Sequence, residues 1–101
     1  VSSPKRLDAL PDLPTVAESG YKGFEADQWY GVVAPTGTPR DIVLKLNSQI
    51  NAALSSVELK TRLSGEGAVA TPNTPEVFGQ LIGQEIVRWR PVMASGRVKA
   101  D

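Results

Sequence analysis

Apolar residues recur at helical spacing in the middle of the sequence, after Thr38-Pro39. They lie three and four positions apart and form one stripe, while polar residues occupy much of the remaining surface. The stripe comprises Ile42, Val43, Leu46, Ile50, Ala53 and Leu54. Thr followed by Pro is typical of a helix start, because Pro has no amide to satisfy in the first turn. The pattern predicts a helix with Thr38 as N-cap and its end near Leu54.

Two further helices are predicted after this one in the sequence. Ser55-Ser56 interrupts the apolar stripe and can cap a short second helix, which Gly65 and Gly67 would close. Thr74-Pro75 repeats the start signal and precedes another stripe, formed by Phe78, Leu81, Ile82, Trp89, Val92 and Met93. Pro91 lies late in this last helix, so the helix either kinks there or ends at Arg90. Gly96 marks its limit.

One segment has the composition of a strand. Residues 29–34 are aromatic, β-branched or small, and Pro35 ends the run. Because the run is nearly all apolar and does not alternate, it predicts a strand that is buried on both faces, as in an α/β sheet. A single strand cannot make a sheet. It therefore needs neighbours from chain that is absent here or from another copy.

Turn-forming residues dominate the first part of the sequence. Pro4, Pro11 and Pro14 exclude a regular helix across it and favour an extended path. Thr15 and Glu18 have the spacing of a capping box, in which each side chain bonds the other residue's amide. With Gly20 as a left-handed stop, this pattern predicts one or two helical turns over residues 16–19.

Composition excludes several classes of function. The 101 residues, 41% of them hydrophobic, fit one small domain or a piece of a larger one. Eleven basic residues balance 11 acidic ones, which argues against a nucleic-acid partner. There is no Cys and no His. Disulfides, thiolate metal sites, a Cys nucleophile and a Ser-His-Asp triad are therefore excluded from this sequence.

The first residues do not form a signal peptide, because no apolar run follows the charged Lys5-Arg6 pair. Val1 is not an initiating Met. We therefore expect a cut inside a longer protein, with any signal peptide in the missing part. No apolar run has the length of a membrane span.

Candidate chemistry is sparse. Four carboxylates lie close together in sequence, but each has a simpler explanation as a turn, a cap or an exposed acid: Asp12, Glu18, Glu25 and Asp27. Trp29 and Tyr30 could line a ligand pocket or pack in a core. The capped turn at Thr15 could hold a carboxylate on its free amides, or it could be capped by itself alone. The residues predict no catalytic site and no metal site.

Taken as a set, these residues resemble a family. The string Leu10-Pro11-Asp12-Leu13-Pro14-Thr15-Val16-Ala17-Glu18-Ser19-Gly20 is followed by Trp29-Tyr30-Gly31-Val32-Val33-Ala34-Pro35-Thr36-Gly37-Thr38-Pro39. Both strings are similar to the extracytoplasmic solute receptors of the tripartite tricarboxylate transporters, also called Bug receptors. Later pieces agree: Leu46-Asn47, Ile50-Asn51, Gly67-Ala68, and Thr74-Pro75-Glu76 with Phe78 and Trp89. The resemblance covers the whole chain and corresponds to the C-terminal third of such a receptor.

The resemblance implies an α/β fold, as a fragment of a two-lobed type II periplasmic binding protein. The fragment would be mostly helical, with one main strand near residues 29–34. Residues 1–26 would be the remnant of the second lobe, an extended loop plus a short helix. Residues 27–101 would be the return strand and the C-terminal helices of the first lobe. The crossing between the lobes provides hinge candidates, namely Phe24, Glu25, Ala26, Asp27 and Gln28.

The resemblance also implies a function. Such a receptor is periplasmic, is not an enzyme and has no cofactor. It captures a small organic carboxylate and delivers it to the membrane permease subunits of the transporter. Candidate ligand-binding residues at the rim are Asp12, Pro14, Thr15, Trp29 and Tyr30. Two alternatives remain: a stand-alone module that recruits a partner or self-associates through its exposed strand, and a domain of an enzyme whose catalytic residues lie elsewhere.

Overall fold

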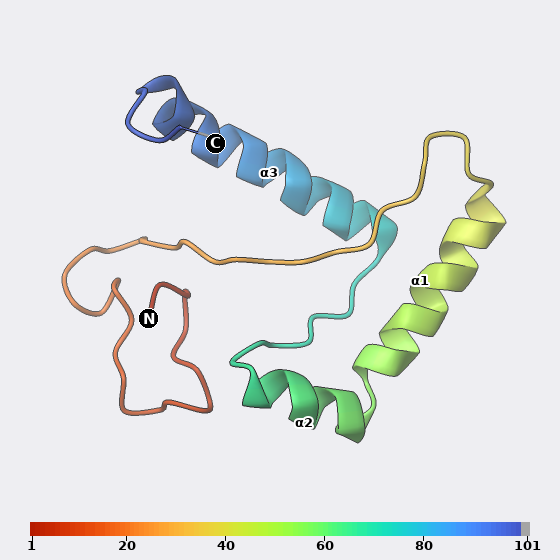
Figure 1. Cartoon of the computed structure of the whole chain (residues 1–101), viewed down its shortest axis with the longest axis horizontal. Coiled ribbons are helices and arrows are strands. Elements are labelled where there is room, and N and C mark those ends of the chain that lie inside the picture. Colours follow the sequence, from red (N-terminus) through yellow and green to blue (C-terminus); the bar gives the residue numbers. More distant parts are fainter. Residues whose placement is uncertain (100–101) are drawn as a thin grey trace.

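A computed structural model describes residues 1–99 of the chain, so the last two positions of the predicted 27–101 unit lie outside it. The described elements are the helices α1 (Arg40–Leu54), α2 (Val57–Gly65) and α3 (Pro75–Ala94). An N-terminal segment, residues 1–23, precedes them without regular secondary structure. Residues 24–35, here called the crossing segment, connect it to the turn before α1 and pass below α3 in the view of Figure 1.

α1 does not begin as predicted. Its N-cap is Pro39, whose ψ of 140° is extended, and Pro39 makes no side-chain cap. The Thr38 hydroxyl instead donates to the carbonyl oxygen of Pro35 at 2.8 Å. The Thr38 amide donates to the same carbonyl and closes a turn in which Gly37 has a φ of 89°. The prediction of Thr38 as N-cap was wrong because this turn already uses both polar groups of Thr38.

The starts of α2 and α3 follow the predictions. The Ser56 hydroxyl accepts from the Leu59 amide at 3.3 Å, and the Thr74 hydroxyl accepts from the Val77 amide at 3.2 Å. Each therefore satisfies one of the amides that a helix N-terminus leaves without an internal partner. Gly67 and Gly96 have φ values of 71° and 69° just past the two helix ends, as predicted for left-handed stops.

α3 continues through Pro91 to Ala94. Proline has no amide, so the helix loses one internal hydrogen bond at this position. The Ser95 amide donates to the Pro91 carbonyl oxygen at 3.1 Å and completes the last turn. The helix therefore does not end at Arg90. Within residues 1–99, no helix combines the length and the apolar character needed to cross a membrane.

The predicted short helix at residues 16–19 is a single hydrogen-bonded turn. The Ser19 amide donates to the Thr15 carbonyl oxygen at 3.2 Å, which is the helical pattern, but no second turn follows. Gly20, with a φ of 114°, ends it. One turn is too short to count as a helix because nucleation is unfavourable without propagation.

The crossing segment is extended but unpaired. No strand ladder is present in the part of the chain that the structure describes. Residues 27–34 make no backbone hydrogen bond there, and Val32 and Val33 are exposed. The predicted strand at residues 29–34 is therefore not formed here, and its predicted burial on both faces is wrong for this chain, because the described residues offer it no neighbouring strand. The prediction that this sequence cannot build a sheet alone agrees with the structure.

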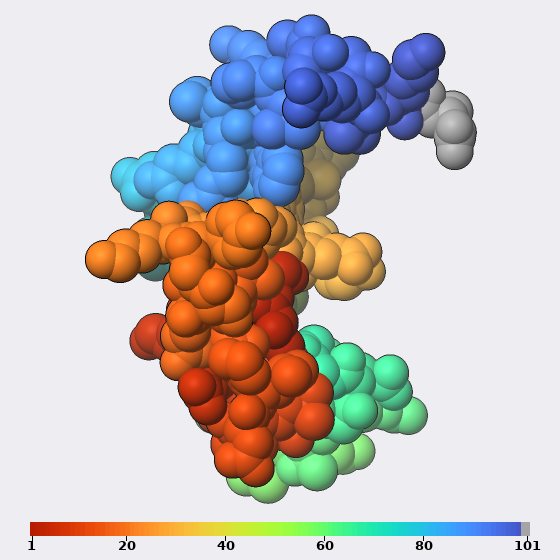
Figure 2. Space-filling view, turned by 90° about the vertical axis from the view of Figure 1, so that its left-hand side faces the viewer, coloured from red at the N-terminus to blue at the C-terminus, as the bar shows by residue number. Residues whose placement is uncertain are grey.

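The helices do not enclose a core. α1 contacts α2 and α3, yet no apolar side chain within residues 1–99 is fully buried. The radius of gyration is 16.4 Å, whereas about 13 Å is typical of a compact chain of this length. The accessible surface of 8356 Å² exceeds the roughly 5,500 Å² expected of a folded monomer of this mass. Figure 2 shows the N-terminal segment, in red and orange, below α3 in that view.

Candidate functional site

The most tightly bonded part of the chain is the turn at Thr15. The Thr15 amide donates to Glu18 Oε2 at 2.8 Å, and the Thr15 hydroxyl accepts from the Glu18 amide at 3.1 Å. This reciprocal pair is the predicted capping box. Thr15 is only 2% exposed. Polar contacts within the turn therefore hold a residue that is almost fully removed from solvent.

Arg6 extends this arrangement. Its Nε donates to both carboxylate oxygens of Glu18, at 3.1 and 3.0 Å, and its Nη1 donates to the Pro11 carbonyl oxygen at 3.0 Å. The hydrogen bond from Arg6, followed by the one from the Thr15 amide, lowers the pKa of Glu18 to about 2. The same contact raises the pKa of Arg6. Sequence reasoning missed this pair because the two residues are far apart in sequence.

The turn makes little of its amide surface available to an anion. The Thr15 and Glu18 amides are bonded within the capping box, and the Val16 amide donates to the Val1 carbonyl oxygen at 2.9 Å. Of the two alternatives that the sequence left open, this geometry favours the self-capped turn. A carboxylate ligand would have to displace the Glu18 side chain to reach the Thr15 amide.

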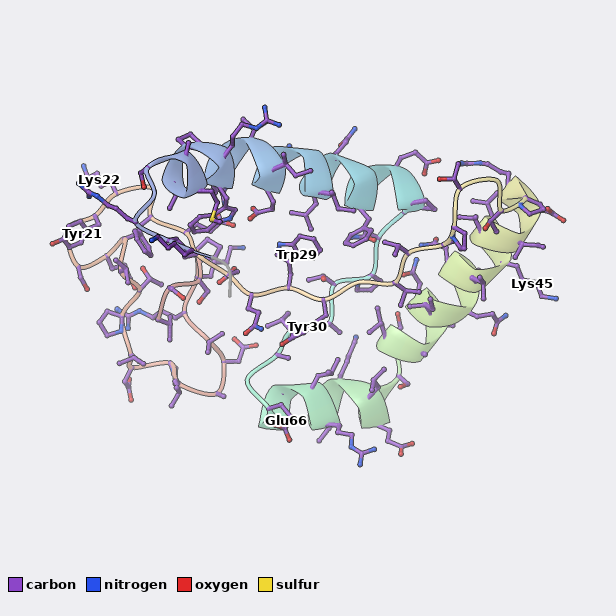
Figure 3. All side chains as sticks on the ribbon, turned by 45° about the horizontal axis from the view of Figure 1, so that its top comes forward. Tyr21, Lys22, Trp29, Tyr30, Lys45 and Glu66 are labelled. Atoms are coloured by element: carbon purple, nitrogen blue, oxygen red, sulfur yellow. The ribbon has the colours of Figure 1, made fainter. Side chains whose placement is uncertain are left out.

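Trp29 and Tyr30 point to opposite sides of the crossing segment (Figure 3). Trp29 packs edge-to-face on Phe78 of α3, with ring centroids 5.6 Å apart and an interplanar angle of 87°. Gly31 makes this approach possible, since a Cβ built at that position would lie 2.1 Å from Phe78 Cζ. The Trp29 contact supports the packing interpretation of this side chain, and Gly31 is a residue whose role the sequence did not reveal.

Tyr30 is a strongly exposed candidate ligand residue. It is 86% exposed, and its hydroxyl oxygen accepts from Gln28 Nε2 at 2.7 Å. Because the hydroxyl accepts this bond, its own proton remains able to donate. A phenol held in this way can donate to a carboxylate.

The remaining candidates lie apart from these groups. Asp12 and Pro14 are exposed on the N-terminal segment, and the Pro14 carbonyl oxygen accepts from the Val1 amino group at 2.8 Å. Two of the hollows formed by residues 1–99 contain no predicted ligand residue. One is a shallow depression on α3, and the other, of about 280 Å³, lies between Leu7–Ala9 and the α2 region. The structure thus brings together Thr15 and its turn partners, but not all five candidates in one pocket.

The predicted hinge residues are held at one end and free at the other. Phe24 and Ala26 donate backbone hydrogen bonds, to Tyr21 and Ser2 respectively. Glu25 pairs with Arg88 of α3 at 3.6 Å, so its prediction as a simple exposed acid was wrong. Asp27 and Gln28 are exposed and lack backbone hydrogen bonds within residues 1–99.

A second polar cluster went unpredicted. Nδ2 of Asn47 and Nδ2 of Asn51 both donate to the Asn73 carbonyl oxygen at 2.8 Å, and Asn51 also donates to Asn47 Oδ1 at 3.3 Å. Both side chains are half-buried, although they are polar residues outside the apolar stripe of this helix. Two Asn residues four apart on one helix face could have indicated this role.

No group of three metal-ligating side chains lies together in the described part of the chain. The arrangement offers hydrogen-bond donors and packing surfaces.

Comparison with known proteins identifies the chain's relatives. Residues 1–96 match the family described as "Tripartite tricarboxylate transporter family receptor". A protein in the tcbD-tcbE intergenic region of Pseudomonas sp. (strain P51) is 38% identical over all of this chain, which covers 30% of that protein. Protein BugT of Bordetella pertussis is 38% identical over 92% of this chain and 28% of its own length.

Solved structures agree. The periplasmic binding protein BugD aligns with a TM-score of 0.80 and 37% identity, over 99% of this chain and 34% of its own. R. palustris Rpa4515, solved with adipate, aligns with a TM-score of 0.78 and 37% identity, over 90% of this chain and 30% of its own. This chain therefore spans about a third of the length of these relatives. It belongs to the receptor family of the tripartite tricarboxylate transporters.

Proposed function

We propose that this chain is part of an extracytoplasmic solute-binding receptor that captures a small organic carboxylate and delivers it to the permease of a tripartite tricarboxylate transporter. The observation that carries the proposal is the likeness to a relative that was solved with the dicarboxylate adipate. Family membership supports the transporter context. In this proposal the protein is periplasmic, has no cofactor and is not an enzyme.

The proposed mechanism is a shift between open and closed states. Residues 1–26 belong to one lobe, and the rest of the chain from residue 27 belongs to the other. An open receptor fluctuates, and a ligand that contacts both lobes stabilises the closed state. The permease then recognises the closed shape. The exposed crossing segment supports this assignment, because a connection between lobes must remain able to bend.

We assign the principal ligand contact in this chain to Tyr30. Its hydroxyl is exposed and oriented by Gln28, and its proton can be donated to a ligand carboxylate. Asp12, Pro14 and Thr15 contribute to the rim of the site from the N-terminal segment. Trp29 supports Tyr30 from the other side of the crossing segment through its contact with Phe78.

Calorimetric titration with adipate and a panel of other mono- and dicarboxylates tests the proposal. A receptor-length polypeptide that carries this chain is expected to bind at least one of them. The 101-residue chain alone is expected to show no micromolar binding, since it contains only part of each lobe. Failure of the receptor-length polypeptide to bind any carboxylate would contradict the proposed function, and micromolar binding by the chain alone would contradict the division into lobes.

Substitution of Tyr30 tests the assigned contact in the same titration. Y30F removes only the hydroxyl and is expected to weaken binding about tenfold, as is typical of losing one hydrogen bond to a charged group. Tyr21 is a matched control, because its side chain is also exposed but lies on the N-terminal segment. Y21F is expected to leave the affinity unchanged. Equal affinities for Y30F and the unsubstituted protein would remove Tyr30 from the site.

A second candidate function is a module that pairs with a partner strand or with a second copy. The observation that favours it is the unpaired backbone of residues 27–34, with Val32 and Val33 exposed. Sedimentation of the chain over a range of concentrations tests this alternative. Association that is abolished by V32K, without any carboxylate binding, would favour the module over the receptor.

A further inference from the structure

Contacts hold the chain on each side of a short gap in the crossing segment. Before the gap, the Ala26 amide donates to the Ser2 carbonyl oxygen at 3.0 Å and ties this residue to the N-terminal segment. After the gap, Trp29 packs on Phe78, and Gly31 lies against the same ring. Between the two anchors lie Asp27 and Gln28. The freedom of the backbone to rotate is therefore concentrated at residues 27–28.

One ion pair bridges this gap. Arg88 Nη2 of α3 lies 3.6 Å from Glu25 Oε2, on the N-terminal side of residues 27–28. Arg88 itself is anchored in α3, because its Nη1 donates to Glu85 Oε1 at 3.0 Å. Glu85 is fixed in turn by the Trp89 indole, whose Nε1 donates to Glu85 Oε2 at 2.7 Å. This chain of contacts directs the guanidinium toward Glu25.

We propose that the Glu25–Arg88 ion pair is a latch between the lobes, and that Asp27–Gln28 is the pivot across which it acts. This inference rests on the proposed function, because it assumes that the two sides of the gap belong to lobes that move. Rotation about the pivot separates Glu25 from Arg88, while the Glu85 and Trp89 contacts stay within α3. The latch therefore stabilises the lobe orientation seen here relative to any other.

The expected effect is modest. Both side chains are partly exposed, at 42% for Arg88 and 39% for Glu25, and exposed ion pairs stabilise a structure only weakly. Loss of the latch is expected to raise the population of other orientations about two- to fivefold. A weak latch suits a receptor, because ligand contacts must be able to overcome it.

Pulsed electron–electron double resonance between two spin labels can measure the population of other lobe orientations. These 101 residues contain no Cys, so K22C and Q80C place unique labelling sites on the N-terminal segment and on α3 of this chain. The label distances are measured without solute in the 101-residue chain and in the receptor-length polypeptide. E25Q and R88Q are each expected to increase the minor distance population two- to fivefold.

E76Q is the matched control, because it breaks another exposed ion pair of α3, with Arg40, that does not bridge the pivot. Its distance distribution is expected to match that of the unsubstituted protein. High salt, which screens ion pairs without any substitution, is expected to reproduce the effect of E25Q. Unchanged distances in E25Q and in high salt, or an equal change in E76Q, would overturn the latch. The measurement needs no ligand, so a failure of the latch is distinct from a failure of carboxylate binding.

Discussion

The N-terminal segment and the three helices are stabilised in opposite ways. The segment has no regular secondary structure, yet it contains the one buried residue of the described part of the chain, Thr15, and a continuous set of polar contacts from Arg6 through Glu18. The helices are regular and mostly well capped, yet their apolar stripes are at most half-buried. Regular structure and completed packing are therefore separate properties in this molecule.

The difference shows which interactions each region needs in order to complete its structure. Short-range hydrogen bonds complete the N-terminal segment, so its conformation is specified by nearby residues. An amphipathic helix is stabilised mainly by burial of its apolar face. The helices of this chain therefore require a surface that the described residues do not supply, and family membership indicates the kind of protein that would supply it.

The substitution with the largest expected effect is one that breaks the contact between the crossing segment and α3. G31A places a methyl group against Phe78, where a Cβ would lie 2.1 Å from Cζ. Overpacking of this kind costs about 1–3 kcal/mol. The free energy of unfolding, followed by tryptophan fluorescence, is expected to fall by that amount. G79A is the control, because nothing lies within 4 Å of its added Cβ and alanine favours a helix by about 1 kcal/mol. A stable G31A would contradict the close approach.

The next effect tests whether Thr15 specifies the N-terminal segment. T15A removes the cap hydroxyl and is expected to cost about 0.5–2 kcal/mol, while T15S retains the hydroxyl. Hydrogen exchange at the Glu18 amide, which donates to this hydroxyl, measures the loss directly. Equal protection of that amide in T15A and in the unsubstituted chain would show that the capping box is not what fixes the turn.

A comparison of the two Thr-Pro pairs gives a smaller effect. T74A removes a hydroxyl that caps α3, whereas T38A removes one that bonds the Pro35 carbonyl and caps no helix. T74A is expected to cost about 1 kcal/mol and to reduce helix content measured by circular dichroism. T38A is expected to leave helix content unchanged. The reverse order would restore Thr38 as the N-cap of α1.

The smallest effect is a pH dependence of the N-terminal segment. The pKa of Glu18 is lowered from its ordinary value of 4.5 to about 2, first by Arg6. The unfolded chain therefore binds more protons between these values, and the contact is fully stabilising above pH 4.5 and lost as the pH falls toward 2. The protection of the Thr15 amide, that is, the ratio of its intrinsic to its observed rate of hydrogen exchange, is expected to fall over that range. E18Q is expected to abolish the dependence, whereas E66Q, at the C-cap of α2, is expected to leave it intact.

The caps and apolar stripes of the helices were predictable because they depend on neighbouring residues. Short spacings predict the Thr15 capping box, the N-caps Ser56 and Thr74, and the glycines at which turns or helices end. The structure confirms them. The family was predictable for a similar reason, since its motifs are contiguous strings.

Contacts between distant residues were not predictable from the sequence. Three such contacts depend on how remote segments are brought together. They are the ion pairs Arg6–Glu18 and Glu25–Arg88, and the hydrogen bonds from two Asn side chains to the Asn73 carbonyl oxygen. No local pattern encodes these distances. The Thr38 cap was wrong for a related reason, because the preceding turn competes for the same hydroxyl. The ligand residues stay a prediction, since the described hollows include none of them.

Small-angle X-ray scattering of the 101-residue chain over a dilution series tests the central claim most directly. The claim is that the apolar helix faces are not covered within this chain. The account predicts an apparent size that rises with concentration, as uncovered apolar faces associate, and a radius of gyration near 16.4 Å at infinite dilution. A concentration-independent value near the roughly 13 Å of a compact domain would show that the chain completes its own core and would contradict the account.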